Sequence, residues 1–159
     1  MRQVPVIAAA IACLIAACSG SAPSTFAVTS ASVDPTYWCP GGANNLAYDL
    51  HATVNVRNGT SRTVAIESMT AEMKLASVHG SWLEKVGDRY DAGSVTFAPS
   101  TVDAASSSAL KVTIPSACTS DKYGAGAASY GDYAVTVHLV TSAGAFSVTA
   151  QNQHEIRTA

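Results

Sequence analysis

The chain has 159 residues and a formal net charge of −2, and charged side chains make up only 13% of it. It contains no cluster of lysine or arginine, which argues against binding to nucleic acid. The scarcity of charged groups also leaves little material for acid–base catalysis.

The first 17 residues have the organisation of an export signal. Arg2 is followed by an almost unbroken apolar run over residues 4–17. As a helix this run would extend about 21 Å, which is short of the ~30 Å hydrocarbon core of a bilayer. Its length therefore indicates a cleaved signal peptide over residues 1–17 rather than a membrane span.

The end of this signal carries a family resemblance. Ile15-Ala16-Ala17-Cys18 resembles the lipobox of bacterial lipoproteins, in which an aliphatic residue and two small residues precede a cysteine. The resemblance implies that Cys18 receives a thioether-linked diacylglyceryl group and becomes the first residue after cleavage. Two acyl chains are enough for stable anchoring. The alternatives are an ordinary secretory signal cut near Ala17 and a rival lipobox at Cys13.

The resemblance implies an exported protein whose N-terminal lipid holds it at the bacterial cell membrane, on the extracytoplasmic face or in the periplasm. Small polar residues follow the cysteine, so residues 18–25 are predicted to be a flexible tether. Residues 26–151 are long enough for one domain with its own core. Residues 152–159 are interpreted as a polar C-terminal tail.

Cys39 and Cys118 are the cysteines that remain once Cys13 leaves with the signal and Cys18 carries lipid. In an oxidising compartment we expect them to form a disulfide. The long loop that it closes would stabilise the fold by on the order of 4 kcal/mol in the chain-entropy model. The alternative is a metal site built from both cysteines and histidines.

Period-two alternation of apolar and polar residues predicts short strands after residue 25. The clearest case is residues 48–57, where Tyr48 and Leu50 begin an inward-facing row and Asp49 and His51 an outward-facing one. Asn58-Gly59 then predicts a turn. The other expected strands cover residues 26–33, 63–76, 95–97, 110–114, 133–139 and 146–150.

Residues 67–76 are compatible with a strand or a helix. Val64 and Ile66 share one phase, whereas the apolar residues from Met69 to Leu75 follow the opposite phase. A bulge near Ser68 would join them into one bent strand. The segment is also rich in helix-forming residues. We favour the strand because the flanking segments are β.

About seven short strands without a clear helix predict an all-β fold, an immunoglobulin-like antiparallel β-sandwich. The segment 131–137, Gly-Asp-Tyr-Ala-Val-Thr-Val, resembles the start of strand F in immunoglobulin-like and fibronectin-like domains. The resemblance implies that the Tyr133 hydroxyl reaches a backbone carbonyl in the turn before Gly131. No cysteine lies two residues after Tyr133 and Cys39 precedes the strand at 48–57, so the resemblance implies the architecture alone.

Two tryptophans receive structural interpretations. Trp38 precedes a half-cystine, and we expect it to cover the disulfide in the core, with a ligand platform as the alternative. Trp82 is expected to anchor a charged loop over residues 80–91. The acidic residues of this loop, Glu84, Asp88 and Asp91, are interpreted as a solvated face, with a weak calcium loop or an acid pair as the alternative.

Other candidate chemistry is weak. Ser108-Ala109-Leu110-Lys111 fits the Ser-x-x-Lys pattern of penicillin-interacting enzymes, but their Ser-Asp-Asn and Lys-Thr-Gly elements are missing from the sequence. A metal site on a strand would most simply show His-x-His, which the sequence lacks. His51 and His138 are expected on outward faces, and if their strands belong to opposite sheets, as B and F do in immunoglobulin-like folds, they cannot meet. The remaining histidines are His79 and His154.

The sequence therefore favours a lipid-anchored, non-enzymatic module of the cell envelope, with no catalytic, metal or cofactor residues. Its expected partners are the membrane, through the lipid, and an envelope protein, a glycan or a small ligand, bound through the loops. The alternative is a structural or assembly accessory subunit of an envelope complex. A small hydrolase or a metal-binding domain is a less favoured hypothesis.

Overall fold

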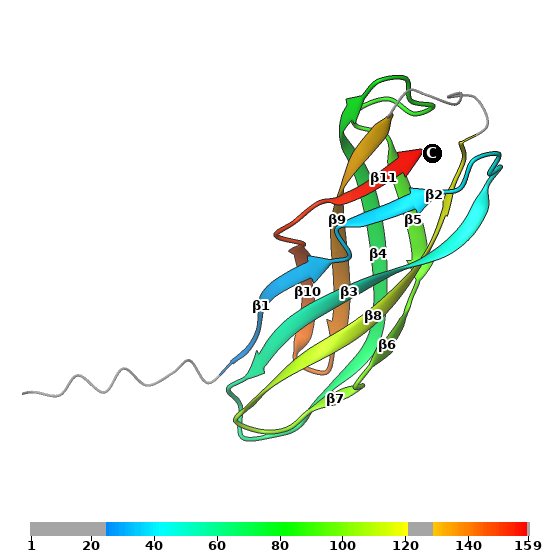
Figure 1. Ribbon diagram of the computed structural model, residues 1–159. Coiled ribbons are helices and arrows are strands. Elements are labelled where there is room, and N and C mark those ends of the chain that lie inside the picture. Colours follow the sequence, from blue (N-terminus) through cyan, green and yellow to red (C-terminus); the bar gives the residue numbers. More distant parts are fainter. Residues whose placement is uncertain (1–24, 121–128, 159) are drawn as a thin grey trace, which may run out of the picture.

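The computed structural model describes residues 25–120 and 129–158, and the regular structure within them is β-strand throughout (Figure 1). The strands are β1 (Phe26–Val33), β2 (Thr36–Cys39), β3 (Leu46–Asn58), β4 (Val64–His79), β5 (Arg89–Ser94), β6 (Thr96–Ala98), β7 (Thr101–Val102), β8 (Ser106–Cys118), β9 (Tyr130–Thr141), β10 (Gly144–Thr149) and β11 (His154–Thr158).

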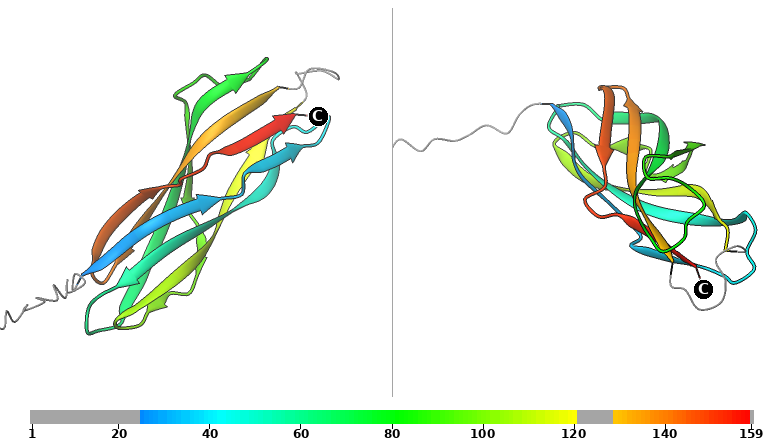
Figure 2. Two further views of the ribbon diagram at one scale, coloured as in Figure 1. Left: turned by 60° about the vertical axis from the view of Figure 1, so that its left-hand side comes forward. Right: turned by 90° about the horizontal axis from the view of Figure 1, so that it is seen from above.

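The strands form two sheets packed face to face (Figures 1 and 2). One sheet has the order β1-β3-β8-β6, and the other has the order β2-β11-β9-β4-β5, with β10 also paired to β9 and β7 to β4. The all-β, immunoglobulin-like sandwich is therefore confirmed. Not every pair is antiparallel, however, because β2 and β11 run parallel.

The core lies between the sheets and follows the predicted alternation. On β3, Leu50 and Val54 are completely buried, while Asp49 and His51 point to solvent. On β9, the buried row contains Tyr133 and Val135 and continues to Leu139. Since successive side chains of a strand point to opposite faces, each of these two strands has one apolar face toward the core.

Strand β4 settles the ambiguity over residues 67–76 in favour of the strand. Its pairing with β9 shifts register between Ile66 and Ser68, where the bulge was predicted, and again between Leu75 and Ser77. The first shift changes the phase of the alternation, so that Met69 and Met73 point into the core.

Several boundaries differ from the prediction. Strand β8 continues through Pro115 to Cys118, with Pro115 opposite Asp49. Residues 36–39 and 89–94, which lie outside the expected strands, are strands β2 and β5, and the start of β5 overlaps the expected loop over residues 80–91. Both are short segments that depend on pairing with distant strands, and neither shows a clear alternation of its own.

The polar tail expected over residues 152–159 is wrong for most of its length, because His154–Thr158 forms β11 between β2 and β9. The completely buried His154 ring is held at both nitrogens. Nδ1 donates to the carbonyl of Asp34 at 2.7 Å, and Nε2 therefore accepts from the Tyr48 hydroxyl at 2.9 Å. Burial lowers the pKa of His154 and raises that of Tyr48 to about 12, which keeps this arrangement neutral.

The chain enters the sandwich at one end, which we call the tether end. There Phe26 pairs with Asn58, and the amide of Gly59 donates to the carbonyl of Thr25. The buried Asn58 side chain donates to the carbonyls of Arg62 and Val102, which confirms the predicted turn after β3. The tether end thus consists of residues 59–63 and 103–105 and the start of β1.

The opposite end, which we call the distal end, consists of loops 40–45 and 80–88, the end of β8, the start of β9 and the end of β11 (Figure 2). Strand β3 runs from one end to the other, a distance of about 40 Å at ~3.3 Å per residue. Within the described parts of the chain, no helix has the length and apolar character that a membrane span requires.

Candidate functional site

The distal end is held together by the disulfide between Cys39 and Cys118, which confirms the predicted pair. Cys39 ends β2 in one sheet and Cys118 ends β8 in the other, so the bond joins the two sheets. Both half-cystines are buried. The bond keeps β2 beside β11 and the loop after β2 close to the end of β8.

Trp38 does not cover this disulfide, and the expectation that it lies in the core is wrong. Its side chain is 63% exposed. Adjacent residues of a strand point to opposite faces, so a buried Cys39 places Trp38 on the outside of the sheet. The alternative interpretation, a ligand platform, stays a prediction.

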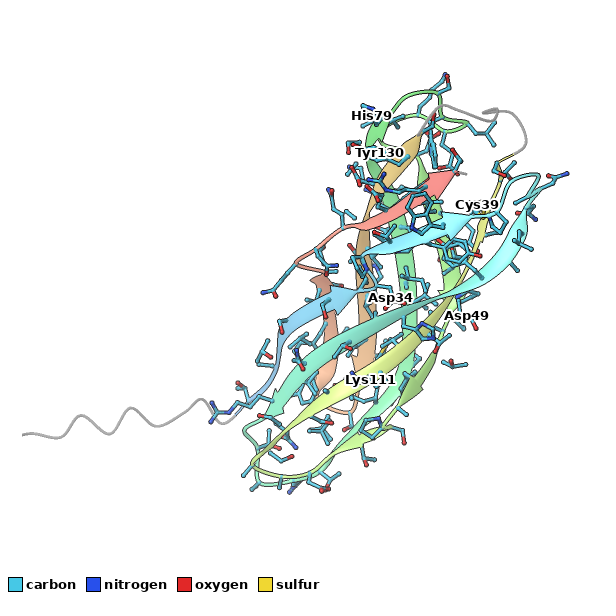
Figure 3. The ribbon with its side chains drawn as sticks, in the orientation of Figure 1. Asp34, Cys39, Asp49, His79, Lys111 and Tyr130 are labelled. Atoms are coloured by element: carbon cyan, nitrogen blue, oxygen red, sulfur yellow. A yellow bond between two sulfur atoms is a disulfide. The ribbon has the colours of Figure 1, made fainter. Side chains whose placement is uncertain are left out.

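Trp38 begins a row of side chains that crosses four strands on the outer face of the sheet. Cross-strand register places it beside Arg157, which lies beside Tyr130, which in turn lies beside His79. The Arg157 guanidinium carbon is 5.6 Å from the Trp38 ring centre and 4.6 Å from that of Tyr130. His79 stacks on Tyr130 at 4.8 Å (Figure 3). We call this set the aromatic row.

Arg157 is fixed within the aromatic row by an ion pair with Glu155, in which both guanidinium nitrogens Nε and Nη2 donate to the carboxylate. This pair raises the pKa of Arg157. Because Tyr130 is covered by Arg157 and His79, the row offers a ligand mainly the edges of its rings and the exposed tryptophan.

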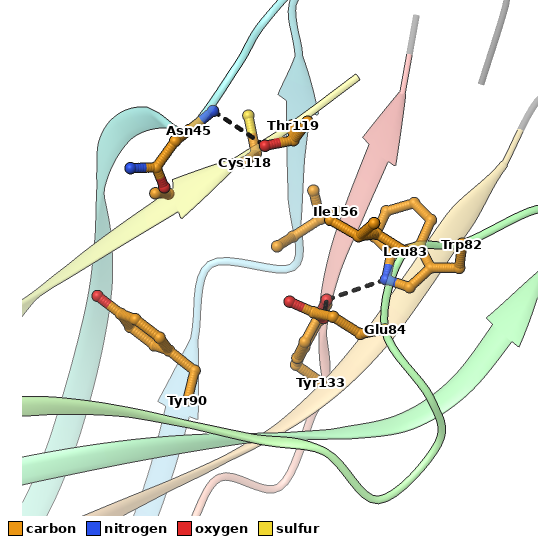
Figure 4. Close-up of a pocket in the computed structure, with 10 residues that line it drawn as sticks. Asn45, Trp82, Leu83, Glu84, Tyr90, Cys118, Thr119, Tyr133 and Ile156 are labelled. Carbon is orange, nitrogen blue, oxygen red and sulfur yellow. Dashed lines mark hydrogen bonds between the residues drawn. The ribbon is translucent and has the colours of Figure 1, made fainter. Parts of the chain in front are cut away.

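A cavity of about 190 Å³ opens between the two sheets at the distal end (Figure 4). Tyr90 of β5 lies on one side of it, and Glu84, Tyr133 and Trp82 lie on the other. Cys118 and Ile156 contribute further apolar wall. The cavity therefore combines aromatic and aliphatic surface with a carboxylate.

The Tyr133 ring is buried, as predicted, but its hydroxyl partner differs from the prediction. Instead of a backbone carbonyl before Gly131, the hydroxyl donates to Glu84 Oε2 and accepts from Trp82 Nε1 at 3.1 Å. Burial and the hydrogen bond to the carboxylate both raise the pKa of Tyr133. The phenol is thus a permanent donor at neutral pH.

The loop after β4 causes this difference, because it folds back over the start of β9. A Cβ atom at Gly131 would lie 2.8 Å from Trp82 Cε2 and 3.0 Å from Leu75 Cδ1. Only glycine leaves room for the indole ring at this position. The close approach of Trp82 to Gly131 brings the indole N–H to the Tyr133 hydroxyl. This hydrogen bond and the one to Glu84 replace the predicted bond to a backbone carbonyl.

Exposed apolar side chains lie at the distal end, and two of them, Leu83 and Tyr90, line the cavity. Leu83 and Val86 are 60% and 62% exposed, and Tyr90 and Leu46 are 42% and 41% exposed. We call these four residues the distal rim. Exposed leucine and valine side chains that gather at one end of a domain are typical of an interaction surface.

The other acidic residues of the loop do not line this cavity, but Asp88 lines an adjoining hollow with Glu84 and Tyr133. Asp88 accepts from the backbone amide of Lys85, and Asp91 accepts from that of Gly93. Arg89 forms an ion pair with Glu72 at 2.9 Å. The described residues contain no group of three histidine, cysteine, aspartate or glutamate side chains that could hold a metal ion.

The remaining sequence candidates lie apart. His51 and His138 are exposed, as predicted, and their strands belong to opposite sheets. Lys111 points outward and donates to Thr53 Oγ1, whereas Ser108 lies on the other face of β8. A serine and a lysine three residues apart on a strand cannot form a nucleophile–base pair. Cys18, Cys13 and the tether before residue 25 lie outside the described residues.

Sequence reasoning missed the cluster of Trp82, Glu84 and Tyr133. Tyr133 lies 51 positions after Trp82 and 49 positions after Glu84 in the chain. Gly131, near the start of β9, belongs to the motif that resembles strand F. A bulky aromatic near it in space could not be foreseen from local patterns.

Comparisons with known proteins describe the fold alone. No family model matches the chain, and no curated protein matches its sequence. Similar solved structures include one described as a late embryogenesis abundant protein, with 18% identity and a TM-score of 0.42 over 80% of this chain and 70% of that one. The major subunit of aggregative adherence fimbriae type I from Escherichia coli has 9% identity and a TM-score of 0.37 over 84% of this chain and 95% of that one.

A PapD-like domain of human CEP192 gives 10% identity and a TM-score of 0.30 over 99% of this chain and 98% of that one. At such identities and TM-scores, these likenesses say nothing about the partners or the activity of this chain.

Proposed function

We propose that this protein is a lipid-anchored, non-enzymatic binding module of the bacterial cell envelope that contacts its partner with the distal end. The observation that carries the proposal is the separation of two ends. The segment that leads from Cys18 enters the sandwich at Phe26, at the tether end, while the distal rim and the cavity lie at the far end of β3.

An anchor at the tether end leaves the distal end free. The tether of residues 18–25 would extend at most about 25–30 Å, and the long axis of the sandwich adds about 40 Å. The distal rim can therefore reach well beyond the headgroup region. The Cys39–Cys118 disulfide agrees with an exported domain, since such bonds persist in oxidising compartments.

The chemistry of the distal end fits binding better than catalysis. Glu84 is the one charged residue among the described residues that line the cavity. Its hydrogen-bond partner Tyr133 has a raised pKa and stays protonated, so it cannot serve as a base near neutral pH. Exposed apolar side chains next to a small aromatic cavity instead provide contact area.

Site-specific photo-crosslinking in living cells tests the proposal. We expect a photoreactive amino acid at Leu83 or Val86 to give a discrete crosslinked species of higher mass. The same amino acid at Arg62, an exposed position of the tether end, should not give that species. A Leu83 probe combined with Val86→Ser should lose most of the product, because the rim loses contact area.

Adducts that form equally from positions 62 and 83, or from position 62 alone, would contradict contact through the distal end. The membrane fraction of each variant must match that of the wild type, so that a loss of product reports contact rather than export.

A further inference from the structure

We propose that the cavity at the distal end binds an alkylammonium group, quaternary or primary, carried by the ligand. This inference rests on the proposed function and names the chemistry of its ligand. It is carried by three features of the cavity: its single charge, its aromatic walls and its size.

The charge in the cavity wall is negative, and the nearby Arg89, which lines an adjoining hollow with Glu84, is paired with Glu72. Glu84 Oε2 accepts from the Tyr133 hydroxyl, while Oε1 has no hydrogen-bond partner among the described residues. In the same part of the chain, no lysine, arginine or histidine forms an ion pair with Glu84. A carboxylate at the wall of a half-enclosed cavity without a cationic partner attracts a cationic ligand and disfavours an anionic one.

The aromatic side chains add to this preference. Trp82, Tyr90 and Tyr133 line the same cavity as the carboxylate (Figure 4). The π-systems of aromatic rings attract cations, and cages of aromatic residues with an acidic group bind quaternary ammonium and methylated amine groups. A neutral apolar group of equal shape would gain only the burial of its surface.

The size of the cavity limits the ligand to a small group. Its volume of about 190 Å³ is below the ~300–1,000 Å³ of pockets that enclose a drug-sized molecule. A trimethylammonium group or an aminoalkyl chain fits such a volume. The remainder of a larger ligand would lie over the distal rim, where Leu83 and Tyr90 line the cavity and are exposed.

Neighbouring hydrogen bonds hold the carboxylate in place. The indole N–H of Trp82 donates to the Tyr133 hydroxyl, which leaves that hydroxyl to donate to Glu84. Because the pKa of Tyr133 is raised, its hydroxyl keeps its proton and remains the donor to Glu84. Donors fixed in this way position a charged group without a further entropy cost when a ligand binds.

A titration of the mature full-length chain in detergent tests the inference. The sequence contains two tryptophans, so Trp38→Phe leaves Trp82 as the fluorescent reporter in the cavity wall. The probes are choline, n-butylammonium and 3,3-dimethyl-1-butanol, the neutral isostere of choline, all at constant ionic strength. We expect saturable quenching or a spectral shift with at least one of the two cations. We expect the neutral alcohol to bind about tenfold more weakly or not at all.

The relative affinities of the two cations identify the kind of ammonium group that the cavity binds. Tighter binding of choline assigns a quaternary ammonium group, and tighter binding of n-butylammonium assigns a primary amine such as a lysine side chain.

Variants separate charge from shape. Glu84→Gln keeps the size and the acceptor oxygen and should weaken cation binding about tenfold. The matched control is Glu67→Gln, at an exposed carboxylate on β4, which should bind like the parent. Tyr90→Leu removes an aromatic wall, leaves the Tyr133–Glu84 hydrogen bond intact, and should weaken binding several-fold.

Three results would overturn the inference: equal affinity for choline and its neutral isostere, no saturable change with either cation, or unchanged cation affinity in Glu84→Gln. None of them alters the crosslinking from position 83 that tests the proposed function. Conversely, cation binding by a chain whose distal end gives no specific crosslink would leave the ammonium site intact and contradict only the proposed partner contact.

Discussion

Tyr133→Ala should lower the free energy of unfolding by about 3–5 kcal/mol, as measured by denaturant titration. The ring is buried, and it packs where the start of β9 meets the loop after β4. Its removal leaves a cavity next to an existing one and deprives both Glu84 and Trp82 of their shared partner. The surrounding sheets are fixed by long ladders and by the disulfide, so they cannot close the space.

Tyr133→Phe separates the hydrogen bonds from the packing. The ring remains, but the hydroxyl that joins Glu84 to Trp82 is lost, so we expect a smaller cost of roughly 1–2 kcal/mol. The controls are His51→Ala and Lys111→Ala on the outer face of the other sheet, which should each stay within about 0.5 kcal/mol of the wild type. A Tyr133→Ala variant as stable as His51→Ala would contradict the inward position of the ring.

The second large effect concerns the disulfide. The double variant Cys39→Ala/Cys118→Ala should lose on the order of 2–5 kcal/mol of stability. The bond joins residues separated by 79 positions and ties the ends of β2 and β8 together across the two sheets. Without it, the unfolded chain gains conformational freedom, and the short parallel pair of β2 and β11 loses its attachment to the other sheet.

Reduction provides the matched measurement. A reductant should lower the melting temperature of the wild type toward that of the double variant and leave the double variant unchanged. A thiol-reactive mass tag should label neither cysteine before reduction. Two freely reactive thiols in the folded, exported protein would contradict the bond.

The sequence predicted those strands whose alternation is local. Residues 48–57 and 133–139 show one apolar face each, and both faces lie in the core. The bulge near Ser68 also followed from the sequence, because a change of phase within an apolar pattern requires an extra residue. These features depend on neighbours in the chain, which a single sequence displays.

The features that were missed depend on distant residues. Residues 154–158 are polar enough to suggest a tail, yet they lie between β2 and β9, and His154 is buried because Tyr48 and the Asp34 carbonyl satisfy both ring nitrogens. Pairing with two strands, one about 120 positions earlier, gives no local signal.

For the site, the alternation of side chains along β2 sets Trp38 and Cys39 on opposite faces. An inward Cys39 requires an outward Trp38, and the general tendency of aromatics to cover disulfides does not override the alternation of a strand. The cluster of Trp82, Glu84 and Tyr133 is different, because it depends on how the loop after β4 folds back onto Gly131. The sequence alone does not show the path of a loop.

Whether a lipid at Cys18 holds this sandwich at the membrane by its tether end is tested most directly by fractionating cells grown with labelled palmitate. We predict that the wild-type chain takes up the label and stays with the membrane fraction. Cys18→Ser, which lacks the acylated thiol, should take up no label and appear in the soluble or secreted fraction. A wild-type chain without label, together with a Cys18→Ser variant that remains with membranes, would contradict a lipid-anchored module.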